Sequence, residues 1–371
     1  MARVAILHNT LDFQGGADVV CLSACAALQA EHSVTLYTIS ESDPGDLAAR
    51  FGIDLDTASL DVRMPTGAEP LARMLSAGAP AVGPQLALRS VLLRRAVGRQ
   101  LGAFDLVVST ANEVSLPTPS VQYVHYPQFR THRLPDGDGG GLNRVWSRLG
   151  APRSDDLDDE TTLLANSAWT ARVTETVYGV RPSVLHPPVD PIAGRNAWGE
   201  RRDGIVVVGR LAPDKRIGDA VRIVDGVRAR GHDLSLQVVG AAPRSYRRYV
   251  RRVESMADKR PYVTVEQNAP RARLEELLCT HKYGLNCKPR EHFGMSVAEY
   301  VASGMVAFAP DSGGQREVLN GRENRLFGSV DEAIDLVAAA AAADDPPVLP
   351  PDRFGSERFR RGISDAVARA L

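Results

Sequence analysis

The segment Arg3-Val-Ala-Ile-Leu-His8 is a short apolar run, and a polar loop that contains Gly15-Gly16 follows it. Residues 18–30 then have the pattern of a helix, and residues 34–39 form a second apolar run. A strand, a glycine loop, a helix and another strand are typical of a βαβ unit with parallel strands. Ligands of such sheets bind beyond the carboxyl ends of the strands, so a site is expected in the loops that follow them.

The same alternation continues along the chain with one interruption, a polar linker that begins at Pro187-Pro188 and ends near residue 203. Before the linker, the pattern predicts strands at 106–109, 121–125, 163–166 and 184–186 and a helix capped by Ser167. After it, the pattern predicts strands at 204–208, 234–239, 262–265, 283–287 and 305–309 and helices at 216–230, 244–258, 270–279 and 295–303. The sequence therefore predicts an α/β protein with two Rossmann-like domains, whose parallel sheets face an interdomain cleft.

The linker also sets the expected domain boundaries. We expect a first domain at residues 1–190, a second at 200–350, and a C-terminal helix within 351–371 that crosses back to the first domain. Two stretches depart from the alternation. Residues 68–102 are rich in Ala, Leu and Arg and predict amphipathic helices, whereas residues 130–156 are rich in Gly, Asp and Arg and predict a long loop.

The composition argues against several classes of protein. The chain has 371 residues and a net charge of -1, so bulk charge does not make it a polyanion-binding protein. No run of about 18 apolar residues is present, and the N-terminal apolar run is too short for a signal peptide, so we expect neither a membrane span nor a cleaved leader. The four cysteines have neither metal-ligand spacing nor a disulfide framework, which fits a reducing compartment.

The segment Lys288–Gly304 is the strongest candidate for a ligand site, because it follows a predicted strand. Glu291 lies on the loop, Phe293-Gly294-Met295 enter the next helix, and Glu299 lies near its first turn. Unpaired backbone N–H groups at a helix start favour an anion, and Gly294 lets a ligand approach the backbone. The two carboxylates can accept hydrogen bonds from sugar or ribose hydroxyls. The alternative is an ordinary helix start with two solvated acids.

Two further loops offer positive charge and a histidine. Arg210 and Lys215 follow a buried strand and can both turn toward one diphosphate. His125 ends a strand of the first half, where it can hydrogen-bond a sugar hydroxyl. The alternatives are a solvated turn for the first loop and a structural histidine for the second.

Two glycine loops are weaker candidates. Gly15-Gly16 permits a turn whose N–H groups point at an anion, although the G-x-G-x-x-G fingerprint of dinucleotide sites is absent. Gly313-Gly314 lies on a loop that leads into a helix after a predicted strand. A plain turn is the alternative for each.

Taken together, these segments resemble the family-four retaining glycosyltransferases of the GT-B fold. Glu291 and Glu299 match that family's E-x7-E pattern, and Gly209-Arg210-Leu211 with Lys215 is similar to its G-R-L-x-x-x-K loop. The glycine pairs fall where the family has similar elements, so the resemblance covers nearly the whole chain. It implies that the first domain binds the acceptor and the second binds the nucleotide-sugar donor.

The resemblance divides the matched residues into two groups. It implies a catalytic role, in stabilising the leaving diphosphate and holding the transferred sugar, for His125, Glu291, Arg210 and Lys215. It implies contacts with the substrate for Gly15, Gly16, Phe293, Gly294, Met295 and Glu299. The family retains the anomeric configuration and uses no essential metal or cofactor, since cationic side chains stabilise the diphosphate instead.

Within that family, three segments are most similar to the α-1,2-mannosyltransferase type that extends the dolichol-linked oligosaccharide: Tyr123-Val-His-Tyr-Pro127, Asn166-Ser-Ala-Trp-Thr170 and Glu291-His-Phe-Gly294. This similarity implies transfer of a hexose, with mannose favoured, from GDP-mannose to a glycan or polyprenyl-linked acceptor. It implies no nucleic-acid partner. The alternative is a non-catalytic or differently reacting GT-B protein that binds a sugar nucleotide, such as an epimerase.

A basic amphipathic stretch indicates an anionic membrane surface as a further partner. Arg89, Arg94, Arg95 and Arg99 alternate there with leucines and valines. A helix of this kind can lie on an anionic bilayer, whereas the alternative is a core-facing helix with a solvated arginine face. We expect a cytoplasmic protein with peripheral contact to the cytoplasmic face of the membrane.

Overall fold

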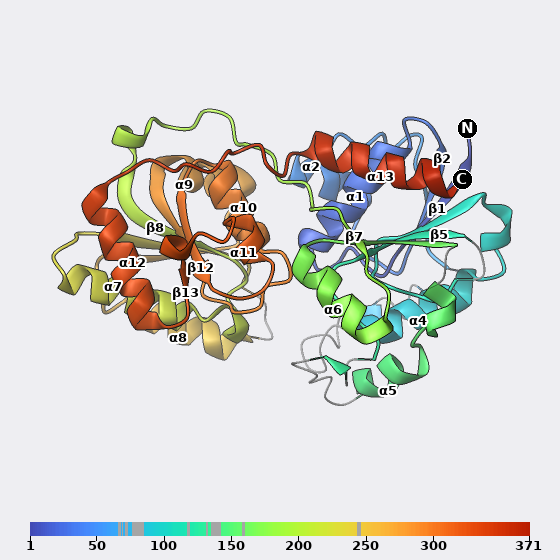
Figure 1. Ribbon diagram of the computed structural model, residues 1–371, viewed down its shortest axis with the longest axis horizontal. Helices are drawn as coiled ribbons and strands as arrows, with labels where there is room; N and C mark the ends of the chain where they lie inside the picture. Colours follow the sequence, from blue (N-terminus) through green and yellow to red (C-terminus); the bar gives the residue numbers. More distant parts are fainter. Residues whose placement is uncertain are drawn as a thin grey trace. The chain divides into compact units, whose positions relative to one another are not determined.

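The computed structural model describes the chain apart from residues 66–67, 69, 71–72, 76–84, 117–118, 131–132, 135–141, 158–159 and 243–245. The chain divides into two compact units. The first unit contains Met1–Pro188 together with Ser356–Leu371, and the second contains Val189–Gly355. Each unit is a parallel β-sheet with helices around it (Figure 1).

The first unit is built on a sheet with the strand order β3-β2-β1-β4-β5-β6-β7 in the described part of the chain. Its strands are β1 (Arg3–His8), β2 (Ser33–Thr38), β3 (Asp61–Arg63), β4 (Leu106–Ser109), β5 (Ser120–Val124), β6 (Thr161–Ala165) and β7 (Ser183–Val184). All neighbouring pairs are parallel. Parallel strands need crossover helices, which explains why apolar runs alternate with helical patterns along the sequence.

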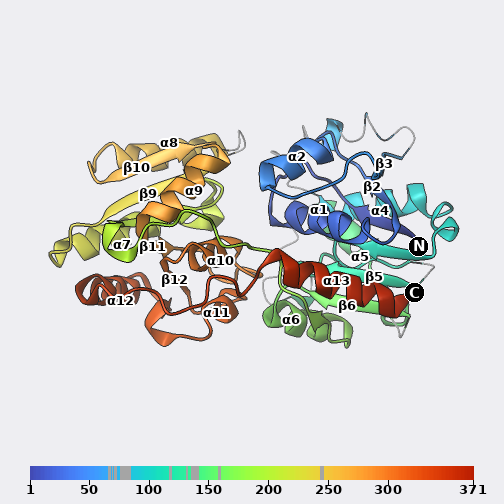
Figure 2. The same ribbon diagram turned by 90° about the horizontal axis from the view of Figure 1, so that it is seen from above.

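Six helices belong to the described part of the first unit: α1 (Gly16–Leu28), α2 (Pro44–Phe51), α4 (Leu86–Val97), α5 (Leu142–Leu149), α6 (Ala168–Tyr178) and α13 (Ser356–Ala370). Helix α13 lies beside α1 in both views (Figures 1 and 2). Its residues Phe359, Ile363, Ala366 and Val367 are buried in one core with α1 and with strands β1, β4 and β5. The C-terminal helix is thus part of the first unit's core.

The second unit is built on a parallel sheet with the order β10-β9-β8-β11-β12-β13 in the described residues. Its strands are β8 (Arg202–Val208), β9 (Ser235–Gly240), β10 (Val263–Gln267), β11 (His281–Leu285), β12 (Val306–Pro310) and β13 (Leu326–Phe327). Its helices are α7 (Ile217–Ala229), α8 (Arg247–Ala257), α9 (Arg271–Thr280), α10 (Met295–Ala302), α11 (Gln315–Val318) and α12 (Val330–Ala343).

Strand β8 is apolar at each of residues 205–208, and the packing of this part explains why. Ile205 and Val207 are buried in a core with α7, α8 and α12, whereas Val206 is buried in a second core with α9 and α10. Successive side chains of a strand point to opposite faces, so a strand covered on both faces needs apolar residues at every position.

The predicted long loop at 130–156 is wrong in part, because it contains helix α5. The gap at 135–141 precedes this helix, and the glycine-rich half of the predicted loop therefore lies largely outside the described residues. The prediction for 68–102 also falls partly outside them, and its described part contains helix α4. The predicted helix 244–258 corresponds to α8, while residues 244 and 245 are not described.

The predicted basic face of helix α4 is wrong at one of its four arginines. Arg89 is fully buried, and its guanidinium donates to the carbonyl of Ile39 over 3.4 Å and lies 5.6 Å from the centre of the Phe13 ring. Arg95 and Arg99 are exposed. One of the four arginines therefore faces the core, where its guanidinium contacts a carbonyl oxygen and an aromatic ring in place of water. Within the described parts of the chain, every helix is too short or too polar to span a bilayer.

Candidate functional site

The loops after β8 and β11 meet in the second unit through a cluster of opposite charges, which we call the lysine–glutamate cluster (Asp214, Lys215, Lys288 and Glu291). Lys215 Nζ donates to Glu291 Oε1, and Lys288 Nζ lies 3.4 Å from Glu291 Oε2. Lys288 Nζ is also 3.4 Å from Asp214 Oδ2. The side chains of Lys215 and Glu291 are 18% and 14% exposed, so this pair is well shielded but open to a ligand.

The electrostatics of the cluster keep Glu291 ionised. Burial by itself would raise the pKa of this carboxyl, but the charges of Lys215 and Lys288 outweigh burial and lower the pKa to about 2. The neighbouring His292 stays neutral, since burial lowers its pKa to about 4. The cluster thus presents two ammonium groups and one permanent carboxylate at the end of the sheet.

Two glycines let the loop after β12 pack against the Glu291 loop. The Gly314 N–H donates to the Glu291 carbonyl over 2.8 Å. A Cβ at Gly313 would lie 2.3 Å from the same carbonyl oxygen, and one at Gly314 would lie 2.2 Å from the carbonyl oxygen of His292. Only glycine fits both positions. The sequence offered Gly313-Gly314 as a candidate loop with a plain turn as the alternative, and the structure gives the pair a role in holding the Glu291 loop.

Arg271 holds the second predicted carboxylate. Glu299 Oε1 accepts a hydrogen bond from Arg271 Nη1 over 2.8 Å, and Arg271 Nε donates to Glu275 Oε1 over 2.8 Å. Glu299 is the fifth residue of α10, so it lies in the second turn and not in the first. Its side chain is 17% exposed. Arg271 thus fixes the direction of this carboxylate through one of its two oxygens.

The remaining predicted residues of the second unit differ in exposure. Arg210 is half exposed and lies 3.9 Å from Asp214, at the edge of the cluster. Gly294 caps α10 with a φ of 101°, a left-handed conformation that favours glycine. Phe293 is buried against Phe354, with ring centres 5.2 Å apart, so only its backbone is placed for a ligand. Met295 packs against the same core.

In the first unit, Gly15 has extended backbone and no left-handed turn. Its N–H donates to Asp18 Oδ2 over 2.8 Å, so a carboxylate within the same loop already accepts from it. Gly16 begins α1, where the first N–H groups of a helix have no partner within the helix. Asp18 is buried, and its other oxygen lies 2.9 Å from His8 Nε2.

His8 connects the glycine loop with the loop after β4. Burial opposes a charge on this histidine, but Cys21 and Asp18 outweigh burial and raise its pKa to about 10. His8 Nδ1 lies 3.0 Å from Thr110 Oγ1 and 3.3 Å from the Thr110 carbonyl oxygen. His125 Nε2 lies 3.1 Å from that same carbonyl oxygen. The chain from Asp18 through His8 and Thr110 to His125 brings two separately predicted segments together.

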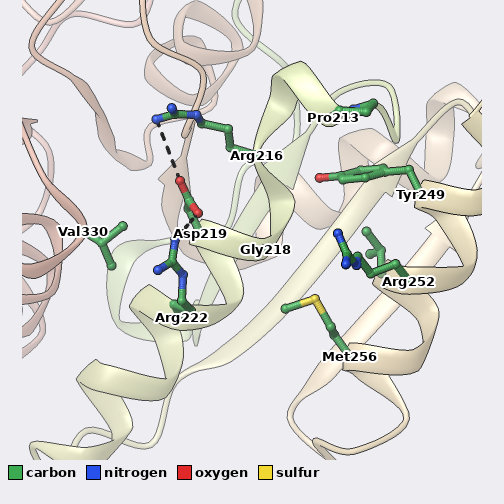
Figure 3. Close-up of a pocket in the computed structure, with 10 residues that line it drawn as sticks. Pro213, Arg216, Gly218, Asp219, Arg222, Tyr249, Arg252, Met256 and Val330 are labelled. Carbon is green, nitrogen blue, oxygen red and sulfur yellow. Dashed lines mark hydrogen bonds and ion pairs between the residues drawn. The ribbon is translucent and has the colours of Figure 1, made fainter.

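A cavity of about 690 Å³ lies beside the β8–α7 loop, and none of the predicted site residues lines it (Figure 3). Arg216 and Arg222 both point toward Asp219, at 3.9 and 2.5 Å. Tyr249 and Met256 of α8 form the opposite wall. The charges of Arg216 and Arg222 are thus directed at Asp219. We therefore keep the lysine–glutamate cluster as the candidate site.

Sequence reasoning missed three residues that contact predicted site residues within their own units. Lys288 is one of only four lysines in an arginine-rich chain and stands three residues before Glu291, so its spacing could have been noticed. Arg271 lies 28 residues from Glu299 and carries no local signal. Asp18 stands three residues after Gly15, the spacing of a capping box, which could have predicted its bond to the glycine loop.

Two parallel-sheet α/β units of this kind define the GT-B fold, and solved glycosyltransferases share it. Anabaena HepE, solved in complex with UDP and glucose, is 13% identical and superposes with a TM-score of 0.64 over 100% of both chains. WaaG, a glycosyltransferase involved in lipopolysaccharide biosynthesis, is 15% identical, with a TM-score of 0.63 over 99% of this chain and 95% of its own. This likeness confirms the predicted fold.

Residues 190–344 match the family model described as glycosyl transferases group 1. The matched segment lies within the second unit and contains the lysine–glutamate cluster together with Glu299 and Arg271. The match covers less than half of the chain, and it supports the predicted class of enzyme.

Two relatives carry the same name, GDP-Man:Man(3)GlcNAc(2)-PP-Dol alpha-1,2-mannosyltransferase. The protein of Eremothecium gossypii is 25% identical over 164 residues, which are 41% of this chain and 28% of the relative. That of Dictyostelium discoideum is 23% identical over 186 residues, which are 44% of this chain and 37% of the relative. The matches thus span about a third of the length of these relatives.

Proposed function

We propose that the chain is a retaining hexosyltransferase that moves mannose from GDP-mannose to a glycan or polyprenyl-linked acceptor. The lysine–glutamate cluster carries the proposal, because it combines two ammonium groups with a permanent carboxylate inside the group 1 glycosyltransferase segment. The names of the two relatives support mannose and the lipid-linked acceptor.

The cluster suits departure of a nucleoside diphosphate. Charge develops on the diphosphate as the bond to the sugar breaks, and preorganised cations stabilise that charge without a solvent rearrangement. Lys215 and Arg210 would supply these cations, so no metal or cofactor is needed for this step. Lys215 now pairs with Glu291 and would exchange part of that contact for a phosphate oxygen.

The carboxylates suit the sugar hydroxyls of the donor. Glu291 would accept from hydroxyls of the transferred hexose, and Glu299, with one oxygen held by Arg271, would accept from the ribose. The N–H groups from Phe293 to Met295 would add donors at the start of α10. In the first unit, His125 would contact the hexose, and the start of α1 at Gly15-Gly16 would approach the diphosphate.

A product assay tests the proposal. The full chain is incubated with GDP-[¹⁴C]mannose and a short polyprenyl-diphosphate oligosaccharide, and the products are separated. We expect a labelled acceptor whose new bond is an α-linkage by NMR, as in the donor. An altered free sugar nucleotide would favour the epimerase alternative, and intact donor with no product would favour a non-catalytic binding protein.

A pair of lysine variants makes the assay specific for the cluster. Lys215→Met keeps the aliphatic stem but removes the ammonium group beside Glu291, and we expect it to lower kcat at least about 100-fold, as the loss of a charge-stabilising group does in other enzymes. Lys259→Met removes an exposed lysine that has no ion pair in the described part of the chain. Equal activity of the two variants would contradict the proposed role of Lys215.

A further inference from the structure

The backbone that carries His125 is held by two side chains from the loop after β4. Asn112 Oδ1 accepts hydrogen bonds from the N–H groups of His125 and Tyr126, over 2.7 and 3.1 Å. Glu113 Oε1 accepts from the N–H groups of Gln128 and Phe129, each over 2.9 Å. We call this set of four bonds the N–H clamp. Two adjacent side chains thus hold four backbone donors within five residues.

The same loop determines which nitrogen of His125 carries a proton. His125 Nε2 lies 3.1 Å from the carbonyl oxygen of Thr110. A carbonyl oxygen can only accept, so Nε2 carries a proton in this contact. The loop after β4 therefore holds both the backbone of the histidine and the proton on its Nε2.

Two residues of the N–H clamp are in energetically unfavourable states. Asn112 has a φ of 69°, a left-handed conformation that asparagine tolerates better than most residues. Glu113 is fully buried and also accepts a hydrogen bond from Tyr178 Oη over 2.7 Å. Burial raises the pKa of Glu113 to about 7. A strained asparagine and a buried acid are uncommon in a loop that only connects two strands.

Two buried oxygen atoms beside the N–H clamp are compatible with a proton on Glu113. Glu113 Oε2 and Gln128 Oε1 are buried and have no hydrogen-bond partner among the described residues. A proton on Glu113 would turn Oε2 into a donor, while Gln128 Oε1 is an acceptor. The two residues already contact each other, since Gln128 N donates to Glu113 Oε1. The neutral acid is thus compatible with the clamp, because Oε1 remains an acceptor.

We propose that Asn112 and Glu113 are positioning residues, which hold the backbone of His125 and the proton on its Nε2 in place during transfer. The inference rests on the proposed function, because it assigns His125 to the transferred hexose. Neither Asn112 nor Glu113 touches the substrate in this account, and both act only through the backbone of residues 125–129.

Matched substitutions separate this role from folding. Asn112→Gly keeps the left-handed backbone and removes the acceptor, whereas Asn112→Asp keeps both. Glu113→Ala removes the second acceptor, whereas Glu113→Gln keeps Oε1 and places a donor at Oε2. We expect Asn112→Gly and Glu113→Ala to lower kcat about 100-fold, the order expected for a misplacement of about 1 Å, with KM for the donor within about twofold. The Asp and Gln variants should recover most of kcat.

A second measurement needs no activity. In the full-length protein labelled with ¹⁵N-histidine, ring ¹⁵N shifts report the tautomer of each histidine, and His125→Gln assigns the His125 signal. We expect the Nε2–H form in the wild-type protein and a mixed or charged ring in Asn112→Gly, together with at least tenfold faster amide exchange at residues 125–126. Asn112→Asp should behave like the wild type in both respects.

The outcomes distinguish the two claims. Loss of the tautomer and of amide protection with unchanged kcat would overturn the positioning role and leave the transferase standing. Unchanged tautomer and protection in Asn112→Gly would overturn the clamp itself. A wild-type protein that holds the tautomer but transfers no sugar would instead refute the proposed function, and with it the use that we assign to the clamp.

Discussion

Glu291 lies between two lysine ammonium groups, and this arrangement determines how its contribution to stability depends on pH. Its pKa in the folded chain is about 2, against an ordinary value of 4.5. A lowered pKa means that the ionised form is the stabilised one, so the contribution is present above pH 4.5 and is lost as the pH falls toward 2. At about 1.36 kcal/mol per unit, the gap from 4.5 to about 2 sets an upper limit of about 3 kcal/mol.

We therefore expect Glu291→Gln to lower the free energy of unfolding by about 2–3 kcal/mol at pH 7, and by less at each step from pH 4.5 to pH 3. Urea denaturation of both proteins across this range measures the difference. Glu323→Gln removes a charge from an exposed residue and should change nothing at any of these pH values. A difference for Glu291→Gln that stays constant with pH would contradict the ion pairing.

For single residues, the sequence predicted which residues belong to the candidate site better than it predicted which residues contact one another. Lys215 and Glu291 were both predicted as site residues, but their contact joins positions 76 residues apart, which no local pattern can indicate. The same holds for Arg271 and Glu299. The tautomer of His125 could not be predicted either, because it depends on a carbonyl group of another loop.

The loop after β12 allows a test at the scale of the element. Gly313 and Gly321 both have a left-handed φ, of 75° and 64°. An added Cβ would strike the Glu291 carbonyl at Gly313 and would meet nothing within 4 Å at Gly321. Gly321→Ala should thus cost only the strain of the backbone, about 1–2 kcal/mol, whereas Gly313→Ala should cost about 1–3 kcal/mol more and weaken donor binding.

Thermal unfolding and donor titration of these two variants measure both effects. Equal stabilities would mean that the two loops are not packed as tightly as the close approach of Gly313 to the Glu291 carbonyl requires. Normal donor affinity in a destabilised Gly313→Ala variant would show that the position of the Glu291 loop does not matter for binding.

Helix α4 allows a second test, of the peripheral contact with an anionic membrane that the sequence predicts. Arg95 and Arg99 remain exposed, whereas Arg89 is buried. We expect Arg95→Ser/Arg99→Ser to reduce salt-sensitive cosedimentation with vesicles that contain phosphatidylglycerol, by about 1 kcal/mol per residue. Arg247→Ser/Arg251→Ser removes the same charge from α8 and serves as the control. An equal loss in both variants would mean that α4 is not a specific contact.

The elements show what a single sequence can predict. Strong alternation gave strand β1 at residues 3–8 and β4 at 106–109 as the structure has them. Helix α5 was missed, because a glycine-rich run precedes it and because its eight residues are fewer than the roughly 11 to 18 over which helical periodicity is usually recognised. Strand β3 has three exposed residues and no apolar pattern, and it is recognisable only from its pairing with β2.

At the scale of the whole molecule, the C-terminal helix belongs to the first unit although the second unit precedes it in the chain. Phe359 is 1% exposed in the core that α13 shares with α1. We expect Phe359→Ala to cost about 3–5 kcal/mol and to lower the unfolding transition of the first unit. Hydrogen exchange of peptides from α1 and α7 assigns the effect to one unit or the other.

Val348→Ala is the control for this test, since Val348 is 67% exposed and lies in the second unit. It should leave both transitions unchanged. Faster exchange of α7 and not of α1 in Phe359→Ala would contradict the assignment of α13 to the first core.

The two-unit organisation was predictable because each unit repeats the alternation of strands and helices on both sides of a polar linker. Both sheets bury their strands on two faces, so the apolar runs are long enough to recognise. The donor and the acceptor are less predictable, because they depend on a few contacts made by loop residues that no periodic pattern marks.

The central claim is that the lysine–glutamate cluster binds a nucleoside-diphosphate sugar, and calorimetric titration tests it most directly. GDP-mannose, UDP-glucose, UDP-N-acetylglucosamine and the free nucleotides are titrated into the wild-type protein and into Lys215→Met and Lys259→Met. The account predicts binding of GDP-mannose to the wild type and to Lys259→Met, and binding at least tenfold weaker to Lys215→Met. Absence of binding by any of these ligands at millimolar concentration, or equal affinity in the two lysine variants, would contradict it.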